Sequence, residues 1–261
     1  MKSIKKYLAT IAMVSALGAA GTANAALSNW YLDSDGAGGN APILVQDYLD
    51  LIGVSYVHNT FTSLTTFNFN ESGLFSTPTA DGPVPIGTPI SPQLTAAFTG
   101  SGTGSVGGTL TFTSGTLVVS SGVTPVATFD LLAGSANLAA GTVLPNGAVS
   151  FIFQATSMSS GYFFDSAMND LAGVVSSPGG VVMGFGTTNV IPLPNAVAPA
   201  LIGLYNSAFD PDQVGPVVPN GTTDLHLSNN GQFRLQVPEP GSLALVGLSL
   251  IGLAGLRRRK D

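Results

Sequence analysis

Cysteine is absent from this chain of 261 residues. Disulfide bonds, thiolate metal sites and thiol catalysis are therefore excluded, and the fold must depend on its hydrophobic core. Charge is also scarce, because only 8% of the residues are charged, against about a quarter in typical soluble domains. The 44% of hydrophobic residues supply material for a core, and the 33 glycines and 17 prolines supply turns.

Positive charge is nearly missing between the two ends of the chain. Seven of the eight basic residues lie in the terminal segments, at Lys2, Lys5, Lys6, Arg257, Arg258, Arg259 and Lys260. Residues 26–237 therefore carry one base, Arg234, and twelve acids, for a net charge of −11. A body of that charge repels phosphate backbones, so no nucleic-acid partner is expected and cations are its natural counterions.

The N-terminus has the three parts of a secretory signal peptide. A basic segment of residues 1–6 is followed by an apolar stretch at residues 8–20 and by an A-x-A site at Ala23 and Ala25. This order predicts export through a Sec-type machinery, with cleavage after Ala25 and a mature chain that begins at Ala26.

The C-terminus predicts a short membrane segment. Residues 242–256 contain no charge, although a full helical span needs about 20 residues. Four consecutive basic residues follow, at Arg257, Arg258, Arg259 and Lys260. By the positive-inside rule this tail is cytoplasmic and the body lies on the other side of the membrane.

The sequence Val237-Pro238-Glu239-Pro240, the apolar segment and the arginine cluster together resemble the PEP-CTERM sorting signal. The resemblance implies processing near this motif by an exosortase, a membrane-embedded cysteine peptidase or transpeptidase of Gram-negative bacteria. It also implies loss of the apolar tail after transient insertion in the inner membrane, and a final place at the cell surface or in the extracellular matrix. The predicted organisation is a signal peptide (1–25), an exported domain (26–236) and a sorting signal (237–261).

Alternation of apolar and polar residues predicts an all-β body. Glycine and proline separate strand-like segments at residues 66–70, 109–113, 116–120, 126–132, 149–155, 181–185 and 233–237. The pair 109–113 and 116–120 reads as the two arms of a hairpin, and short helices are expected at 45–51 and 165–171. The proline-rich stretches 78–92 and 192–219 are excluded as central strands. We expect an antiparallel β-sandwich with Greek-key or jelly-roll connections.

Two neighbouring segments suggest ligand sites. The acidic, glycine-rich segment 33–40 offers the carboxylates of Asp33 and Asp35, which suit Ca²⁺, although a solvated turn explains the same residues. Trp30 and Tyr31 precede this segment and are the best candidates for stacking on a sugar ring at the surface. No cofactor is required by either interpretation.

Signals for catalysis are weak. Residues 102–107 match G-x-G-x-x-G, but no helix is expected after them, so we interpret these glycines as a hairpin loop. His58 and His226 are far apart in the sequence and lack the spacing of a zinc site. Glu71 could pair with an aspartate as in a glycosidase, but nothing in the sequence selects the partner.

A non-enzymatic role is therefore the leading hypothesis. The segment 69–75 and the β-rich body are similar to flocculation-associated PEP-CTERM proteins, which implies a structural or adhesive role in exopolysaccharide-associated flocs or biofilms. The alternatives are a Ca²⁺-dependent carbohydrate-binding module and a secreted polysaccharide hydrolase.

Overall fold

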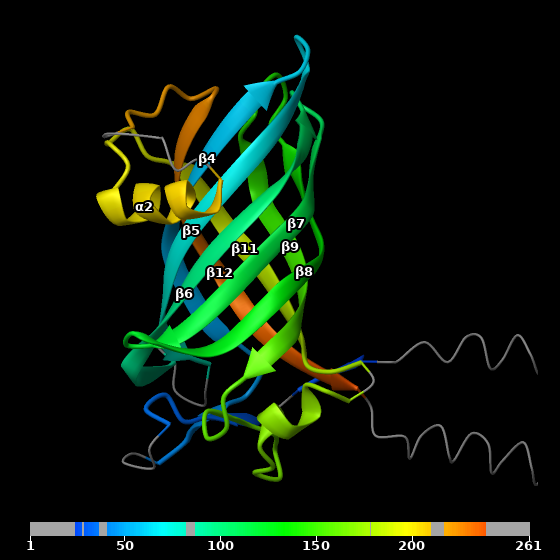
Figure 1. Ribbon diagram of the computed structural model, residues 1–261, viewed down its shortest axis with the longest axis vertical. Helices are drawn as coiled ribbons and strands as arrows, with labels where there is room; N and C mark the ends of the chain where they lie inside the picture. The colour runs from blue at the N-terminus through cyan, green and yellow to red at the C-terminus, as the bar shows by residue number, and fades with distance from the viewer. Residues whose placement is uncertain are drawn as a thin grey trace, which may run out of the picture.

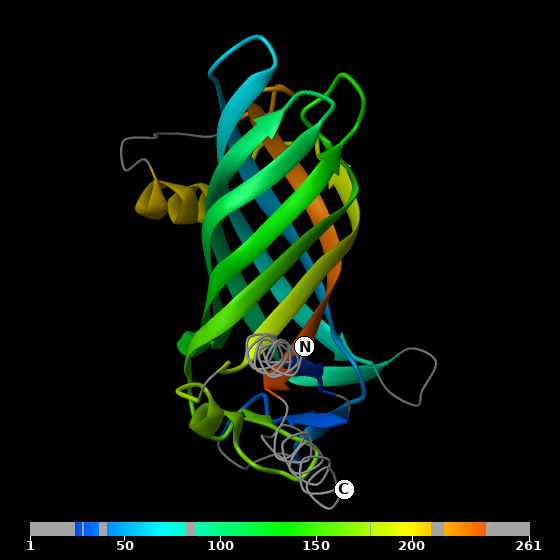
Figure 2. The ribbon, with the colours of Figure 1, turned by 90° about the vertical axis from the view of Figure 1, so that its right-hand side faces the viewer.

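Eight long antiparallel strands form a closed barrel in the computed structural model, which describes residues 24–27, 29–36, 41–81, 87–177, 179–209 and 217–238 (Figures 1 and 2). The barrel strands are β4 (Leu49–Phe61), β5 (Thr66–Ala80), β6 (Thr88–Ser105), β7 (Thr109–Ser121), β8 (Thr124–Leu138), β9 (Pro145–Met158), β11 (Val182–Pro192) and β12 (Asp224–Pro238).

The barrel is closed by the pairing of its first and last strands. Each strand pairs with the next along the chain, and β12 returns to pair with β4 from Asp224 opposite His58 to Phe233 opposite Leu49. The prediction of an all-β body is confirmed, but the prediction of a β-sandwich is wrong. Both architectures require the same alternation along each strand, and only this pairing of distant segments distinguishes them.

Phenylalanine rings fill the interior by lying over glycines of neighbouring strands. Phe67 pairs with Gly104 and Phe69 with Gly102. A Cβ atom on Gly102 would lie 2.6 Å from the Phe69 ring and 2.1 Å from the carbonyl oxygen of Thr111. The prediction of a hairpin loop at 102–107 is therefore wrong for Gly102 and Gly104, which lie in strand β6, and only Gly107 belongs to the turn that follows it.

The predicted hairpin at 109–120 is also wrong, because the segment is one continuous strand, β7. Its residues stay paired with β6 across the supposed turn, with Ser101 opposite Ser114 and Gly100 opposite Gly115. The actual turns at the two ends of β7 contain Gly107 and Gly122, which both have a positive φ. Gly115 does not have a positive φ.

A small sheet covers one end of the barrel, the lower end in Figure 1. It consists of β10 (Phe163–Phe164), β2 (Trp30–Leu32) and β3 (Ile43–Val45), and the 3₁₀-helix η1 (Leu171–Val174) lies beside it. Trp30 is completely buried here, with its ring centroid 6.3 Å from that of Phe163 and 6.4 Å from that of Phe233. Helices were predicted at 45–51 and 165–171, and both predictions are wrong. The first segment contains the end of β3 and the start of β4, and the second is a loop that ends where η1 begins.

The only α-helix of the described residues, α2 (Pro199–Ala208), packs against the outside of the barrel over β4, β5 and β6 (Figure 1). Its Leu201, Ile202 and Tyr205 bury Tyr56, which points out of β4. The Ser72 hydroxyl donates to the carbonyl oxygen of Leu201 at 3.2 Å. The described residues 193–209 and 217–219 of the proline-rich connection lie outside the barrel strands, as predicted, although Pro192 ends β11 and the helix was not foreseen. The exclusion of 78–92 from the strands is wrong at both ends, because β5 continues through Pro78 to Ala80 and β6 begins at Thr88.

The N-terminal strand and the end of the last strand meet at the covered end of the barrel. Strand β1 (Asn24–Ala26) pairs with β12 so that Ala25 lies opposite Val237 and Asn24 opposite Pro238. The opposite end carries the turns at 62–65, 106–108 and 139–144, which are joined by backbone hydrogen bonds from Val106 to Thr65 and from Gly107 to Thr142. We call this opposite end the mouth.

Residues 1–23 of the predicted signal peptide and most of the sorting segment lie outside the described residues. Within the part of the chain that the structure does describe, no helix combines the length and the apolar character needed to span a membrane.

Candidate functional site in the barrel lumen and at its mouth

The interior of the barrel, which we call the lumen, is mostly apolar, with polar side chains on one side only. Four neighbouring strands supply these polar side chains, with Asn59 from β4, Glu71 from β5, Thr187 from β11 and Asn229 from β12. Phenylalanine, leucine and valine side chains from these strands and from β6, β7 and β9 make up most of the remaining lining. A cavity of about 40 Å³ remains among them. A few polar groups in an apolar cavity make this the leading candidate for a binding site.

Glu71 is the acidic residue of this cavity. Strand alternation from Phe67 through Phe69 places its side chain inside the barrel, where it lines the cavity. Burial raises the pKa of Glu71 to about 7, although a hydrogen bond from Ser55 opposes the shift. The Asn229 Nδ2 atom donates to the Ser55 hydroxyl at 2.8 Å, so that Ser55 links the carboxyl group to the amide.

Asn59 joins the lumen to a loop at the mouth. Its Nδ2 atom donates to the carbonyl oxygen of Thr222 at 2.7 Å. Its Oδ1 atom is buried and has no hydrogen-bond partner. Leaving such an acceptor unpaired costs about 1–3 kcal/mol, so this atom marks a place where a donor would stabilise the lumen.

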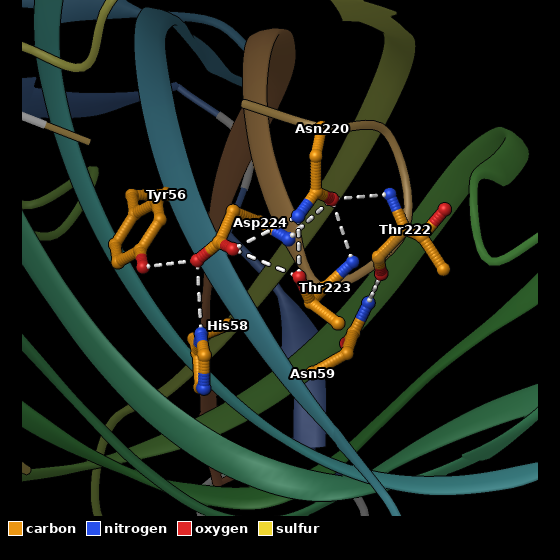
Figure 3. A network of polar contacts seen from close by, with 7 residues as sticks. All are labelled: Tyr56, His58, Asn59, Asn220, Thr222, Thr223 and Asp224. Carbon is orange, nitrogen blue, oxygen red and sulfur yellow. Dashed lines mark hydrogen bonds and ion pairs between the residues drawn. The ribbon is translucent and has the colours of Figure 1, made fainter. Parts of the chain in front are cut away.

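At the mouth, Asp224 is the centre of a polar network (Figure 3). Its Oδ1 atom accepts from the Tyr56 hydroxyl at 2.7 Å and lies 2.9 Å from His58 Nδ1. Its Oδ2 atom accepts from the Thr223 hydroxyl at 2.8 Å and from Asn220 Nδ2 at 3.2 Å. Burial raises the pKa of Asp224, but the hydrogen bonds from His58, Tyr56 and Thr223 outweigh it and hold the pKa below its usual value.

The closure of the barrel brings the two histidines onto neighbouring strands. His58 lies opposite Asp224, and His226 lies opposite Tyr56. The His58 side chain is 36% exposed, and an Nδ1 proton shared with Asp224 leaves its Nε2 atom as an acceptor. His226 is buried, and its Nδ1 donates to the carbonyl oxygen of Asn195 at 3.1 Å. The sequence analysis treated the histidines as separate, because no local pattern predicts that β4 and β12 are neighbours.

The described part of the predicted Ca²⁺ segment directly follows β2 in the small sheet that covers the barrel end, which we call the cap. Asp33 is 6% exposed, and it accepts a hydrogen bond from Gly36 N at 3.1 Å. Burial raises its pKa, and a hydrogen bond with Asp35 adds to the shift. Residues 37–40 lie outside the described residues, and the described part holds no group of three or more acidic or histidine side chains placed for a metal. Ca²⁺ binding stays a prediction.

Two interpretations of individual residues need correction. Trp30 does not offer a surface for a sugar, because it is 0% exposed beneath the cap, whereas the adjacent Tyr31 is half-buried. Among the described residues, no aspartate lines the cavity that contains Glu71, so this part of the structure offers no partner for the glycosidase pair considered above.

The predicted processing sites lie at the covered end of the barrel. Ala25 and Ala26 belong to β1, and Val237 and Pro238 end β12. Ala23, Glu239, Pro240 and the basic residues 257–260 lie outside the described residues. Strand β12 therefore leads directly from the barrel wall into the C-terminal motif.

Comparison with known proteins identifies the C-terminal segment. Residues 236–260 match the model of the PEP-CTERM protein-sorting motif. No curated protein and no solved structure matches the chain. The match covers the sorting segment and does not extend over the barrel. The chain is therefore a PEP-CTERM protein, exported, processed by an exosortase and sorted to the cell surface.

Proposed function

We propose that this barrel has a structural, adhesive role in the exopolysaccharide-associated matrix of flocs or biofilms. In this proposal a Sec-type machinery exports the chain, and residues 242–256 insert transiently in the inner membrane before the exosortase acts. The barrel then remains at the cell surface or in the matrix as a non-catalytic module.

The outer wall of the barrel is the observation that carries this proposal. Between residues 88 and 158 the sequence contains one acid, Asp130, and no base. The outward positions of β6 to β9 are dominated by hydroxyl and amide side chains, at Thr95, Thr99, Ser101, Thr103, Thr109, Thr111, Thr113, Ser114, Thr116, Ser120, Thr128, Ser135, Asn137, Ser150, Gln154 and Thr156.

A neutral wall of this kind suits a neutral, hydroxyl-rich polymer. Many weak hydrogen bonds can form along it, and neither charge repulsion nor a phosphate-binding patch interferes. The hydroxyl side chains also form rows that run across neighbouring strands. One such row consists of Thr103, Thr111 and Ser135, which occupy paired positions on β6, β7 and β8. A long polymer can therefore contact several strands at once.

The position of the sorting motif agrees with this role. Because β12 ends at the covered end of the barrel, an attachment near Pro238 leaves the outer wall and the mouth free for matrix contacts.

The test is aggregation of cells that lack the chain and are complemented with variants. We expect the full chain to restore aggregation, and a row variant with Thr103→Glu, Thr111→Glu and Ser135→Glu to fail at equal surface amounts. A matched row with Thr103→Ser and Thr111→Ser keeps the hydroxyls and should restore it. Equal aggregation by the acidic row would contradict the proposal.

A Ca²⁺-dependent carbohydrate-binding module is the second candidate, favoured by the contact between Asp33 and Asp35. It predicts that Ca²⁺ raises the melting temperature of the protein and that Asp35→Asn abolishes this rise. If Ca²⁺ has no effect on the unmodified protein, this candidate is rejected.

A further inference from the structure

We propose that the mature chain is closed head to tail, because the exosortase joins the C-terminus that it creates near Pro238 to the α-amine of Ala26. The contact between β1 and β12 presents this amine to the processed end. The inference rests on the predicted removal of residues 1–25 and on processing by the exosortase. It is independent of the adhesive role, which uses the outer wall of the barrel.

The two processing sites lie opposite each other in the structure. Strand β1 runs antiparallel to the end of β12, so that Ala25 lies opposite Val237 and Ala26 lies opposite Gln236. The bond that is cut to release the signal peptide therefore lies beside the first residue of the sorting motif. At about 3.3 Å per residue, Ala26 is only about 7 Å along the strand from the level of Pro238.

Contacts that remain after cleavage hold the new N-terminus in this place. The backbone N of Leu27 donates to the carbonyl oxygen of Leu235 at 2.9 Å, and the Leu27 side chain packs against the core. The backbone N of Asn29 donates to the carbonyl oxygen of Gln46 at 2.9 Å, and the adjacent Trp30 is completely buried. The mature chain is therefore fixed to the barrel from its second residue onward.

Closure fits the geometry of a hairpin. The last hydrogen-bonded pair before the junction is Leu235 with Leu27. A bond from Pro238 to Ala26 leaves a loop of four residues, which are 236–238 and 26. Hairpin loops of four or five residues are common, so a cut one residue later is also compatible. So short a tether keeps the amine at an effective concentration of about millimolar or more, which favours it over acceptors from other molecules.

The exchange of bonds is balanced. In the first step the cysteine thiolate of the exosortase attacks the carbonyl carbon of Pro238, the bond to Glu239 breaks, and the nitrogen of Glu239 leaves with a proton from an acid of the enzyme. In the second step the uncharged α-amine of Ala26 attacks the thioester. The new amide forms, the thiolate leaves, and the attacking nitrogen gives one proton to a base. One peptide bond replaces another, so no oxidant, reductant or nucleotide is needed.

The experiment is mass spectrometry of the protein recovered outside cells with and without the exosortase. Between residues 26 and 238 the sequence contains a single basic residue, Arg234, and therefore a single site for trypsin. After unfolding, trypsin opens a ring into one fragment, whereas it cuts a linear chain into residues 26–234 and a short C-terminal peptide. With the exosortase, we expect an intact mass one water below that of the linear chain, a single tryptic fragment, and a fragment spectrum in which a residue of the motif is followed by Ala26.

Two variants test whether the contact with β12 presents the amine. Leu27→Asp places a charge against the core and should release the N-terminus, so that the ratio of circular to linear protein falls severalfold. Leu27→Ile keeps an apolar side chain of the same size and should close like the unmodified chain. The mass of the linear product establishes that both variants begin at Ala26.

Four results would each overturn the proposal. The first is a linear chain with a free amine at Ala26, and the second is a linear chain whose processed C-terminus carries another acceptor. The third is equal closure of Leu27→Asp and Leu27→Ile. The fourth is a chain that keeps residues 1–25 or 257–261 in the presence of the exosortase, because closure needs both cuts. The adhesive role is tested separately by aggregation, and none of these results decides it.

Discussion

The unmodified barrel should become less stable as pH rises, because Glu71 ionises in the lumen. Replacing Glu71 with glutamine should abolish this decrease. The folded pKa of about 7 lies above the ordinary value of 4.5. A raised folded pKa means that the stability from the protonated carboxyl group is fully present below the unfolded pKa and is lost as pH rises through the folded pKa. Glutamine cannot ionise and should show no such loss.

The size of the effect follows from the shift. A difference between 4.5 and about 7 corresponds to about 3 kcal/mol at about 1.4 kcal/mol per unit of pKa. For a domain of this size that is a difference of about 6–12 °C in melting temperature. Glu71→Gln should match the unmodified protein at pH 4 and exceed its stability by about this amount at pH 9.

The assay is urea unfolding of both proteins from pH 4 to pH 9, followed by circular dichroism, in buffers free of amines. The difference between the two curves isolates Glu71, because every other titrating group is common to both proteins. Asp130→Asn, which replaces an exposed acid on the outer wall, is the control for the loss of one acidic side chain. Parallel curves for Glu71→Gln as well would refute the placement of a desolvated carboxyl group in the lumen.

Three further predictions concern the wall, the mouth and the ends of the barrel. Gly102→Ala should destabilise the fold by about 3 kcal/mol or more because its Cβ meets backbone, whereas Gly184→Ala, which faces open space, should cost under about 1 kcal/mol in urea unfolding. Asp224→Asn should cost about 1–2 kcal/mol at pH 7, and the cost should vanish in acid, because the lowered pKa means that this stability is lost as pH falls. Cleavage of residues 1–25 removes the partner of Val237 in β1, so hydrogen exchange at that amide should accelerate. The first prediction is contradicted if Gly102→Ala and Gly184→Ala are equally stable. The second is contradicted if Asp224→Asn costs the same stability in acid as at pH 7, and the third if exchange at the Val237 amide is unchanged by the cleavage.

The strands were predictable because their alternation is local. Phe67, Phe69 and Glu71 share one face of β5 in the sequence and in the structure, and this pattern could have placed Glu71 inside. The number of strands was harder to predict, because a glycine can mark either a turn or a strand position over which a phenylalanine ring packs. Gly102 and Gly115 serve strands, while Gly107 and Gly122 form turns with positive φ.

Closure and the polar network could not be predicted from the sequence. Both depend on the pairing of β12 with β4, which joins residues such as His58 and Asp224 across 166 positions. The loop-closure entropy of such a contact is compensated by the whole barrel and leaves no local signature. Trp30 was misplaced for a similar reason, because the cap that buries it is assembled from β2, β3 and β10.

The sorting signal was predictable in full because it is linear. Its motif, apolar segment and basic tail are adjacent in the sequence, and a peptidase reads an extended peptide instead of a folded surface. The match over residues 236–260 confirms this part of the sequence analysis.

The central claim is that the chain is exported and then cut at its C-terminal motif, and the intact mass of the protein recovered outside the cells tests it most directly. With a working exosortase, we expect a mass that begins at Ala26 and ends near Pro238-Glu239-Pro240. Without the exosortase, the C-terminal segment should remain. A mass that still includes residues 257–261 in both strains would contradict the account.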